Sequence, residues 1–387
     1  MVFVMRYPSR VISGPHSLSA LPAELKGRFG GILIVSGSAS LRRSGVLSRL
    51  ESGLRDVGLE VSVFEGVERE PSVSTVDRCV QHLNEFRSQV KGPVGVLGIG
   101  GGSVLDVAKA AAGLANDPAT ALDAFRGRSI TSKGVPFLAV PTTAGSGAEA
   151  TNNAVLIDTE RGVKASIRSD SFIAELIVLD PELTLTVPKD VTAASGMDSL
   201  TQAIEGYTSI HANEFTRPLS REAFRLVARN LTRAYEVGDD ISARDALLKA
   251  SFLGAVAFGS CRLGAVHGIA HPVGVRYGAP HGVVCAILLP HVMRFNMQEC
   301  LDDYATLAQD VGTVKKKASA KVLAASLIGM VEQLNESMGI PRKLKEIGLV
   351  EEDIEAIAEE SLPSGSLAAN RRKVQKEDVI TILRANL

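Results

Sequence analysis

The chain has 387 residues, of which 45% are apolar and 22% charged, a balance typical of a well-packed globular protein with room for two domains. A formal net charge of −1 argues against a nucleic-acid partner, because binding a phosphate backbone requires a surplus of basic residues. No apolar run approaches the length of a membrane span, and Met1–Arg6 is too short for a signal-peptide core. The four cysteines form no CxxC pair, so we expect a cytoplasmic protein with reduced thiols and no membrane partner.

The first half of the chain alternates short β-branched runs with segments of helical length. Strands are predicted at residues 31–36, 60–64, 94–98, 136–140 and 175–179. Helices are predicted between them at residues 45–57, 74–89 and 103–115. Buried runs separated by helices predict a parallel sheet with helices on both faces.

The pattern changes after residues 180–183. From Val191 onward the apolar residues recur with helical periodicity, and no series of strands follows. Residues 187–190 mark the boundary, because proline disfavours helix at the residue before it and Asp190 is placed to cap the next helix. The sequence therefore predicts an α/β nucleotide-binding domain over residues 1–187 and an all-helical domain over residues 188–387.

Two glycine-containing loops follow predicted strands. In residues 98–103, Gly-Ile-Gly-Gly-Gly-Ser, the glycines let the backbone approach a pyrophosphate at the start of the next helix. This loop is not the usual GxGxxG pattern, since Ser103 stands at its end, and a tight turn without a ligand is the alternative. Residues 141–147 add hydroxyl groups and glycines after another strand. Two such loops at one sheet favour a dinucleotide lying across the sheet edge.

The helical half carries a candidate metal site. Asp198 and Gln202 are four residues apart, so both project from one face of a predicted helix. His267 and His271 share a face in the same way, and His281 follows ten residues later. A carboxylate, an amide oxygen and imidazoles are ligands that suit Zn²⁺ or Fe²⁺. The alternative is a set of buried histidines with a purely structural role.

Five motifs resemble the iron-containing (group III) alcohol dehydrogenase family, and the similarity runs from about Arg10 to the C-terminus. The motifs are Gly100–Lys109, Pro141–Glu149, Asp180–Thr184, Gly196–Tyr207 and Gly264–His291. The resemblance implies a dinucleotide-binding α/β domain, a helical metal-binding domain with the dehydroquinate synthase-like fold, and a homodimer or larger assembly.

The resemblance also implies roles for individual residues. Asp198, His267 and His281 match three of the family's four metal-ligand positions, but Gln202 stands where the fourth ligand is usually histidine. Glutamine offers a neutral oxygen, so either the metal affinity and metal choice change or three protein ligands hold the metal with Gln202 outside. His271 matches a position linked to proton transfer, which suits an imidazole with a near-neutral pKa.

The implied activity is a metal-dependent, NAD(P)-linked alcohol dehydrogenase or aldehyde reductase, with His271, Asp198 and His267 as catalytic residues. A bound Fe²⁺ or Zn²⁺ would polarise the substrate oxygen while hydride passes between carbon and nicotinamide. Three alternatives remain at this point. They are a dehydroquinate synthase-like cyclase or lyase, a maleylacetate reductase-like enzyme, and a catalytically silent nucleotide-binding protein.

NADP(H) is favoured over NAD(H), because an aspartate commonly stands at the position of Gly37 in NAD-preferring relatives. Here Arg42 and Arg43 follow instead, although an ordinary glycine turn with solvated arginines is the alternative. We expect the dinucleotide to contact a set of residues from the strand ends and adjoining segments. They are Gly37, Ser38, Ser40, Gly100, Gly101, Gly102, Ser103, Asp106, Thr142, Thr143, Ser146 and Lys164.

The sequence says little about the substrate beyond a small aldehyde or its alcohol. Arg262 and Arg276 flank the histidine motif and could bind a carboxylate or phosphonate on the substrate bidentately. Structural ion pairs are the alternative for both.

Overall fold

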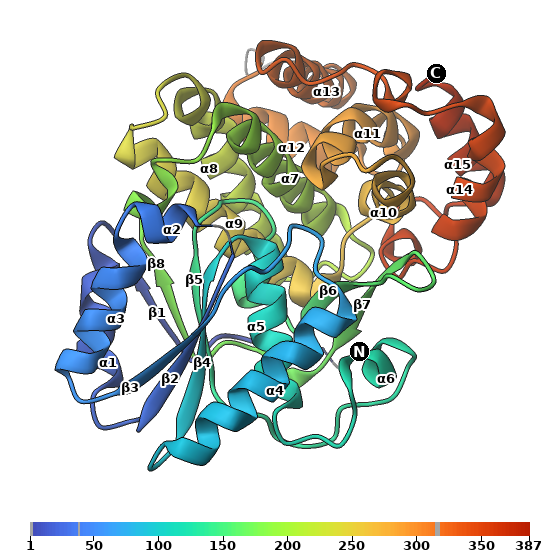
Figure 1. The fold of residues 1–387 in the computed structure, drawn as a ribbon. Coiled ribbons are helices and arrows are strands. Elements are labelled where there is room, and N and C mark those ends of the chain that lie inside the picture. The colour runs from blue at the N-terminus through green and yellow to red at the C-terminus, as the bar shows by residue number, and fades with distance from the viewer. Residues whose placement is uncertain (1–2, 38, 314–317) are drawn as a thin grey trace. The chain divides into compact units, whose positions relative to one another are not determined.

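The computed structural model describes residues 3–37, 39–313 and 318–387, which form two compact units. The first unit runs up to Thr143 and includes Gly147–Thr184, and the second comprises Ala144–Ser146 and the chain from Leu185 onward. The first is an α/β unit and the second is helical, which confirms the predicted fold class (Figure 1).

The first unit is built on a six-stranded sheet in which all neighbouring strands are parallel. Its order is β1-β8-β5-β4-β2-β3. The strands are β1 (Arg10–Ser13), β2 (Gly31–Ser36), β3 (Glu60–Phe64), β4 (Val94–Gly100), β5 (Phe137–Pro141) and β8 (Leu176–Leu179). Four of them are buried along their whole length, because helices cover both faces of the sheet.

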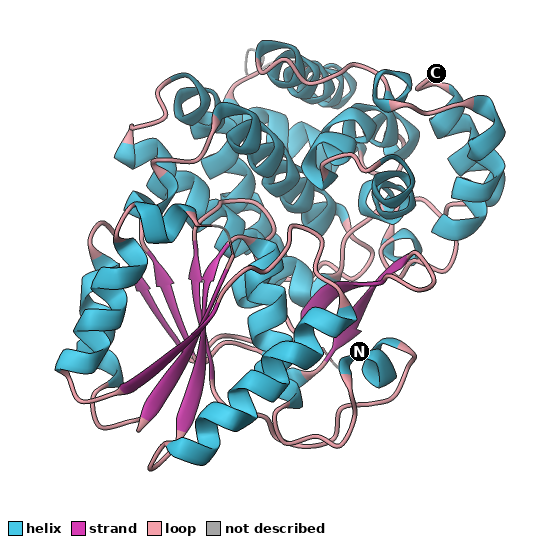
Figure 2. Ribbon diagram, in the orientation of Figure 1, coloured by secondary structure: helices cyan, strands magenta, loops and turns pink. Residues whose placement is uncertain are grey.

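Helices α1 (Leu21–Leu25) and α3 (Val46–Asp56) cover one face of the sheet, and α4 (Val73–Gln89) and α5 (Gly102–Leu114) cover the other (Figure 1, Figure 2). Leucines of α1 and α3 pack against alternate residues of the strands to form the core of the first face. Two short helices, α2 (Ser40–Arg43) and α6 (Ala121–Phe125), complete this unit.

The sequence missed three strands of this unit. β1 has four residues, three of them exposed at the sheet edge, so no buried apolar run identifies it. β6 (Asn153–Asp158) and β7 (Val163–Arg168) form an antiparallel hairpin outside the main sheet. Buried and partly exposed residues alternate along β6. A single short run with this alternation, outside the series of buried strands, is a weak signal for a strand.

The second unit consists of helices, with no strand among its described residues. They are α7 (Lys189–Thr208), α8 (Thr216–Glu236), α9 (Ile241–Cys261), α10 (Ala265–Tyr277), α11 (His281–Asn296), α12 (Leu301–Val311), α13 (Ala320–Ser337), α14 (Ile354–Ser361) and α15 (Lys376–Arg384). Short 3₁₀ helices occur in both units. These are η1 (Ser17–Ala20), η2 (Ala148–Ala150), η3 (Asp170–Phe172), η4 (Pro181–Thr184), η5 (Leu344–Ile347), η6 (Glu351–Asp353) and η7 (Leu367–Ala369).

Helix α7 is the buried centre of the second unit, and every residue from Gly196 to Thr208 is buried. Gly196 lets α8 approach closely, since a methyl group there would overlap the side chain of Leu231. The prediction that Asp190 caps this helix is wrong. Pro188 occupies the N-cap because its φ of −60° suits a helix start, and Asp190 lies in the first turn, where its charge still favours the helix dipole.

Within the described ranges, no single helix is both long and apolar enough to cross a membrane. Helices α9 and α10 meet that test only as a pair, and the pair is bent by 102° at the break between them.

Candidate functional site

Three of the segments predicted to bind a dinucleotide lie at one edge of the α/β sheet. β2, β4 and β5 are neighbours, so the residues that follow them emerge side by side at the carboxyl ends of parallel strands (Figure 1). Gly37 follows β2, Gly101 and Gly102 follow β4, which ends at Gly100, and Thr142 and Thr143 follow β5. The two loops after β4 and β5 are joined directly, because the Thr142 amide donates to the Gly100 carbonyl at 2.9 Å. This edge is where open α/β sheets bind nucleotides.

The glycines of the β4–α5 segment serve two purposes. A methyl group at Gly98 would lie 2.8 Å from the Ala108 side chain, and one at Gly100 would lie 2.6 Å from Val104. These two glycines therefore let α5 pack closely on β4 whether or not a ligand binds. Gly101 is the N-cap of α5, so Gly101 and Gly102 are the positions where a phosphate could approach the free amides of the helix.

Three of the predicted cofactor residues have contacts within the α/β unit. The Ser103 hydroxyl donates to the Arg69 carbonyl, and Lys164 forms an ion pair with Glu70 at 2.5 Å. Asp106 is 8% exposed and accepts a hydrogen bond from the Val155 amide at 3.1 Å.

The other cofactor predictions fall on different parts of the chain. Ser40 begins α2, and Ser146 lies in the short segment that belongs to the helical unit. Ser38 lies outside the described residues.

A buried charge cluster that the sequence analysis overlooked surrounds Lys109. Its ammonium group is fully buried and donates to the carbonyl oxygens of Ala148, Thr151 and Asn153. Asp106 lies 3.5 Å away on the same helix. Lys109 thus fastens the segment before β6 to α5. In the sequence, the only indication of this cluster is that Lys109 lies three residues after Asp106, a spacing at which two side chains of a helix can form an ion pair.

Burial dominates the ionisation of this cluster. It raises the pKa of Asp106 to about 6 against the opposing effect of Lys109, and it lowers the pKa of Lys109 itself. Burial also raises the pKa of Glu149 to about 7. Glu149 is 2% exposed, and its Oε1 has no hydrogen-bond partner among the described residues.

The arginines considered for anion binding differ in their partners. Arg42 forms ion pairs with Glu51 at 2.6 Å and Glu65 at 2.8 Å. Arg276 is held by Asp353 and Glu360, at 3.0 and 2.6 Å, which is the structural alternative considered for it. Arg262 directly follows α9 and has an unusual φ of 63°.

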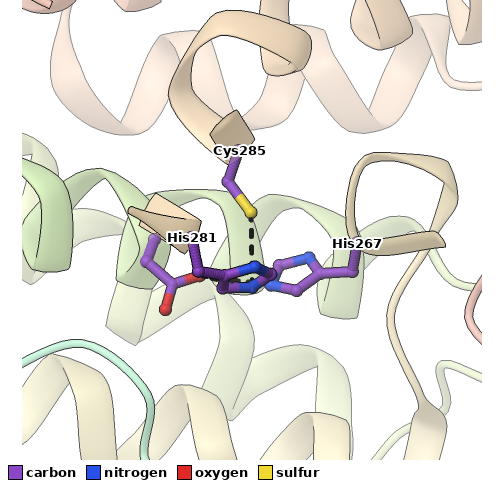
Figure 3. A group of neighbouring side chains, drawn as sticks. His267, His281 and Cys285 are labelled. Carbon is purple, nitrogen blue, oxygen red and sulfur yellow. Dashed lines mark hydrogen bonds and ion pairs between the residues drawn. The ribbon is translucent and has the colours of Figure 1, made fainter. Parts of the chain in front are cut away.

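In the helical unit, the structure brings Asp198, His267 and His281 together. Asp198 comes from α7, His267 from the first turn of α10, and His281 is the first residue of α11. His267 Nε2 lies 3.2 Å and His281 Nε2 lies 3.9 Å from the same oxygen, Asp198 Oδ1. Cys285, one turn further along α11, adds its sulfur to the group, and the four ligand atoms all lie within 4.8 Å of one another. Figure 3 shows the Cys285 sulfur directed at the imidazole of His281, with His267 alongside.

Glu205 orients His267 from behind. Its Oε2 lies 2.6 Å from His267 Nδ1, while its Oε1 accepts a hydrogen bond from the Val266 amide at 2.7 Å. With Nδ1 donating to Glu205, Nε2 of a neutral ring carries the lone pair, and this nitrogen faces Asp198. A carboxylate behind a histidine is the usual arrangement that fixes a metal-binding imidazole.

The charges of this cluster favour a cation. Burial works to lower the pKa of His267, but the hydrogen bonds to Asp198 and Glu205 prevail and raise that pKa to about 9. Burial likewise opposes ionisation of Asp198, but the hydrogen bond from His267 and the nearby imidazoles hold the pKa of its carboxyl below the usual value. A pocket that stabilises a proton on His267 in this way would also stabilise a divalent ion in place of that proton.

The surroundings of Gln202 also indicate that the cluster can hold a cation. It is 3% exposed, its side chain helps to lower the pKa of the Asp198 carboxyl, and its Oε1 is buried with no hydrogen-bond partner among the described residues. Leaving a buried acceptor unsatisfied costs about 1–3 kcal/mol, so an additional group beside it is expected. The residues present therefore fit a divalent cation.

His271 lies beside the cluster, one turn after His267 on α10. Its ring centroid is 5.1 Å from that of His281. It is half-buried, unlike His267, which is 3% exposed.

Sequence reasoning missed Glu205 and Cys285, although helical spacing gave a signal for both. Glu205 lies seven residues after Asp198 and three after Gln202, hence on the same face of α7. Cys285 lies four residues after His281 on α11. Both residues lie within the family motifs Gly196–Tyr207 and Gly264–His291, but the resemblance gave neither of them a role at the metal site.

Comparison with known proteins finds relatives along the whole chain. Residues 8–181 match the profile of "Iron-containing alcohol dehydrogenase", and residues 192–387 match that of "Fe-containing alcohol dehydrogenase family, C-terminal". The 1,3-propanediol dehydrogenase of Klebsiella pneumoniae is 33% identical over 374 residues, covering 96% of this chain and 95% of that protein. The NADPH-dependent butanol dehydrogenase of Clostridium saccharobutylicum is 32% identical over 386 residues, covering 97% and 96%. A crystal structure of 1,3-propanediol oxidoreductase superposes with a TM-score of 0.93 at 32% identity and full coverage of both chains.

Proposed function

The chain belongs to the iron-containing alcohol dehydrogenase family of NAD(P)-linked oxidoreductases, and we propose that it interconverts a small aldehyde and its alcohol at one divalent cation held by Asp198, His267 and His281. The observation that carries this proposal is the convergence of these three side chains from α7, α10 and α11 on a common point. The family assignment favours a dehydrogenase over the cyclase that the sequence had left open.

The chemistry divides between the bound groups and the protein. When bound, the cation polarises the substrate oxygen and the nicotinamide carries the hydride. Glu205 holds the His267 ring in orientation through Nδ1. The burial of Asp198, Glu205 and His267, each at most 6% exposed, keeps bulk water away from the charges at the site.

His271 is our candidate for the group that exchanges a proton with the substrate oxygen. It is half-buried beside His281, so it can reach both the site and solvent. We expect His271→Ala to lower turnover by about 10²–10⁴-fold, the usual contribution of one general acid–base group, and to remove one limb of the pH profile. Steady-state kinetics from pH 6 to 10 at equal metal content would test this. Full turnover with an unchanged pH profile would refute the role.

For the cofactor we propose NADP(H) as the preferred form. A glycine at position 37 leaves the end of β2 without the carboxylate that would repel a 2′-phosphate. Arg43 is the better candidate partner for that phosphate. Arg42 is held by Glu51 and Glu65, whereas none of the ion pairs between described residues involves Arg43.

We further propose a homodimer or larger homo-oligomer and a cytoplasmic location. The first rests on the family resemblance and would be tested by light scattering coupled to size exclusion. The second is supported by four buried cysteines that form no disulfide, as expected in a reducing compartment.

The activity is tested by measuring NADPH and NADH oxidation against short aldehydes, with metal-stripped protein and with protein reloaded with Fe²⁺ or Zn²⁺. Part of the panel should carry a carboxylate or phosphonate, because Arg262 is exposed close to the start of α10. Metal-dependent net oxidation of NADPH would support the reductase, since a cyclase recycles its nicotinamide. Tight cofactor binding without net oxidation under any metal would instead favour the cyclase or the silent nucleotide-binding protein.

A further inference from the structure

Cys285 is the fourth ligand-type side chain at the cluster of Asp198, His267 and His281. It lies one helical turn after His281 on α11, and its sulfur is 3.5 Å from His281 Nε2. It is fully buried. Among the described residues, it is the only cysteine grouped with other metal-ligating side chains, since Cys79, Cys261 and Cys300 are buried elsewhere.

We propose that the Cys285 thiolate is a protein ligand of the metal, so that the ligand set is Asp198, His267, His281 and Cys285. This rests on the metal site of the proposed function and specifies its fourth position. The geometry carries this proposal, because the four ligand atoms lie within 4.8 Å of one another and can therefore face one ion. The thiol proton is released to solvent when the metal binds.

Gln202 then has a supporting role. Its side chain helps to hold the pKa of Asp198 below the usual value, and a neutral amide oxygen is a weaker ligand for Zn²⁺ than a thiolate. Its Oε1 is buried and has no hydrogen-bond partner among the described residues, so a group outside the protein is expected beside it. In this ligand set, Cys285 of α11 takes the fourth position instead of Gln202 of α7.

A thiolate ligand changes the metal that the site prefers. Soft sulfur ligands select zinc over harder ions, whereas a neutral amide oxygen gives no such preference. We expect Zn²⁺ to compete effectively against Fe²⁺ in the unmodified chain. In Cys285→Ala this preference for zinc should fall, and the zinc affinity should drop by more than the roughly 10- to 100-fold that loss of an outer-shell partner costs.

Cobalt substitution tests the ligand directly. The purified full-length protein, stripped of metal and loaded with one equivalent of Co²⁺, should show a thiolate-to-cobalt charge-transfer band in the near ultraviolet. Cys285→Ala should lose this band but keep the visible bands of bound cobalt. Cys79→Ala, which removes a buried cysteine of α4 in the other unit, is the matched control and should keep both.

The outcomes separate the fourth ligand from the metal site itself. Stoichiometric cobalt without a charge-transfer band, or a band that survives in Cys285→Ala, would overturn the assignment and leave the proposed function standing. Cobalt that fails to bind even the unmodified protein would overturn both. Gln202→Ala should keep the band. Because an amide oxygen gives no thiolate band, cobalt bound without the band in the unmodified protein, together with weaker cobalt binding in Gln202→Ala but not in Cys285→Ala, would assign the fourth position to Gln202 instead.

X-ray absorption on the zinc-loaded, unmodified protein makes the test independent of any variant's ability to fold. We expect one sulfur neighbour at about 2.3 Å, the usual zinc–thiolate distance. A first shell made up only of nitrogen and oxygen, at about 2.0–2.2 Å, would exclude Cys285.

Discussion

Glu205 connects the proposed metal ligand His267 to the first turn of α10. One oxygen accepts from the backbone amide of Val266 and the other contacts the imidazole, so a single carboxylate sets both the helix start and the ring orientation. Gly264 leaves room for this arrangement, since a methyl group there would lie 2.8 Å from Glu205 Oε1 and 3.0 Å from Asn370 Oδ1.

Replacing Glu205 by glutamine should weaken metal binding without removing a ligand. The amide keeps the shape of the side chain but loses the negative charge that favours a cation at His267. We expect a roughly 10- to 100-fold loss in zinc affinity, measured by competition with a chelator. Glu236→Gln, at an exposed position in the same unit, is the control and should bind zinc as the unmodified chain does. Equal affinities for the two variants would show that the carboxylate is not needed.

Substitution of Gly37 tests the cofactor preference, but the test needs a control for the crowding that any side chain causes at this position. A Cβ at this position would lie 2.9 Å from a methyl group of Val104, so any larger residue disturbs the start of α5. Gly37→Asn imposes nearly the same crowding without the charge, which makes it the matched control for Gly37→Asp. We expect only the aspartate to raise the ratio of kcat/KM for NADH over NADPH, by about tenfold or more, because like charges placed side by side cost several kcal/mol. An equal ratio in both variants would refute the role of position 37 in the proposed NADP(H) preference.

At the scale of elements, the metal site depends on how closely α11 approaches α7. Gly282 stands at the start of α11 immediately after His281, and a methyl group there would overlap the carbonyl oxygen of Ala194 in α7. The opposing atom belongs to the backbone, so it cannot rotate out of the way. This close contact fixes the start of α11, from which His281 extends toward Asp198.

Gly282→Ala should therefore destabilise the protein and loosen the site. Overpacking of this kind costs about 1–3 kcal/mol, which urea unfolding would measure, and zinc affinity should fall with it. Gly329→Ala in α13 is the control, because a methyl group at this position would meet no other atom within 4 Å and the change replaces a glycine inside a helix by alanine. That control should gain about 0.5–1 kcal/mol. A stable Gly282→Ala variant with normal zinc affinity would contradict the importance of the contact.

At the scale of the whole molecule, stability should depend on pH through Glu149. Burial raises the pKa of its carboxyl from 4.5 to about 7, so between these values the folded chain holds a proton that the unfolded chain has released. Stability supplied by this group is therefore complete below pH 4.5 and is lost as the pH rises toward 7.

Glu149→Gln stays neutral and should escape that loss. Its free energy of unfolding relative to the unmodified chain should increase from pH 4.5 to 7, by an amount on the order of 3 kcal/mol, and then level off. Urea titrations at several pH values would measure it, with the exposed Glu85→Gln of α4 as the control. A constant difference across this range would mean that Glu149 is ionised in the folded protein throughout.

Much of this architecture is predictable because buried strands and amphipathic helices leave periodic patterns. The strands at 31–36 and 60–64 have the predicted bounds, and the three predicted helices of the α/β unit, found as α3, α4 and α5, begin and end within one residue of the predicted positions, whereas the short α1, α2 and α6 were not predicted. β1 and the β6–β7 hairpin were not found, because an exposed edge strand and an isolated hairpin lack a continuous apolar run.

Only part of the candidate site could be predicted from the sequence. Asp198, His267 and His281 belong to motifs that mark them, and the structure brings them together. Glu205, Cys285 and Lys109 depend on tertiary neighbours instead. Spacing along one helix places each of them on the same face as a predicted site residue, but their roles follow from which atoms face them across α10, α11 and the β6–β7 segment, which spacing does not give.

Three of the four clustered side chains come from one short stretch, residues 267–285 of α10 and α11, whereas Asp198 precedes His267 by 69 positions. With the proposed ligand set, such a stretch would offer zinc three ligands before the rest of the helical unit has folded, when α7 is not yet packed. Zinc bound by the unfolded chain reduces the stabilisation that zinc gives the native state. The same ion would act early in folding, by holding two helices together until the carboxylate of a third completes the site.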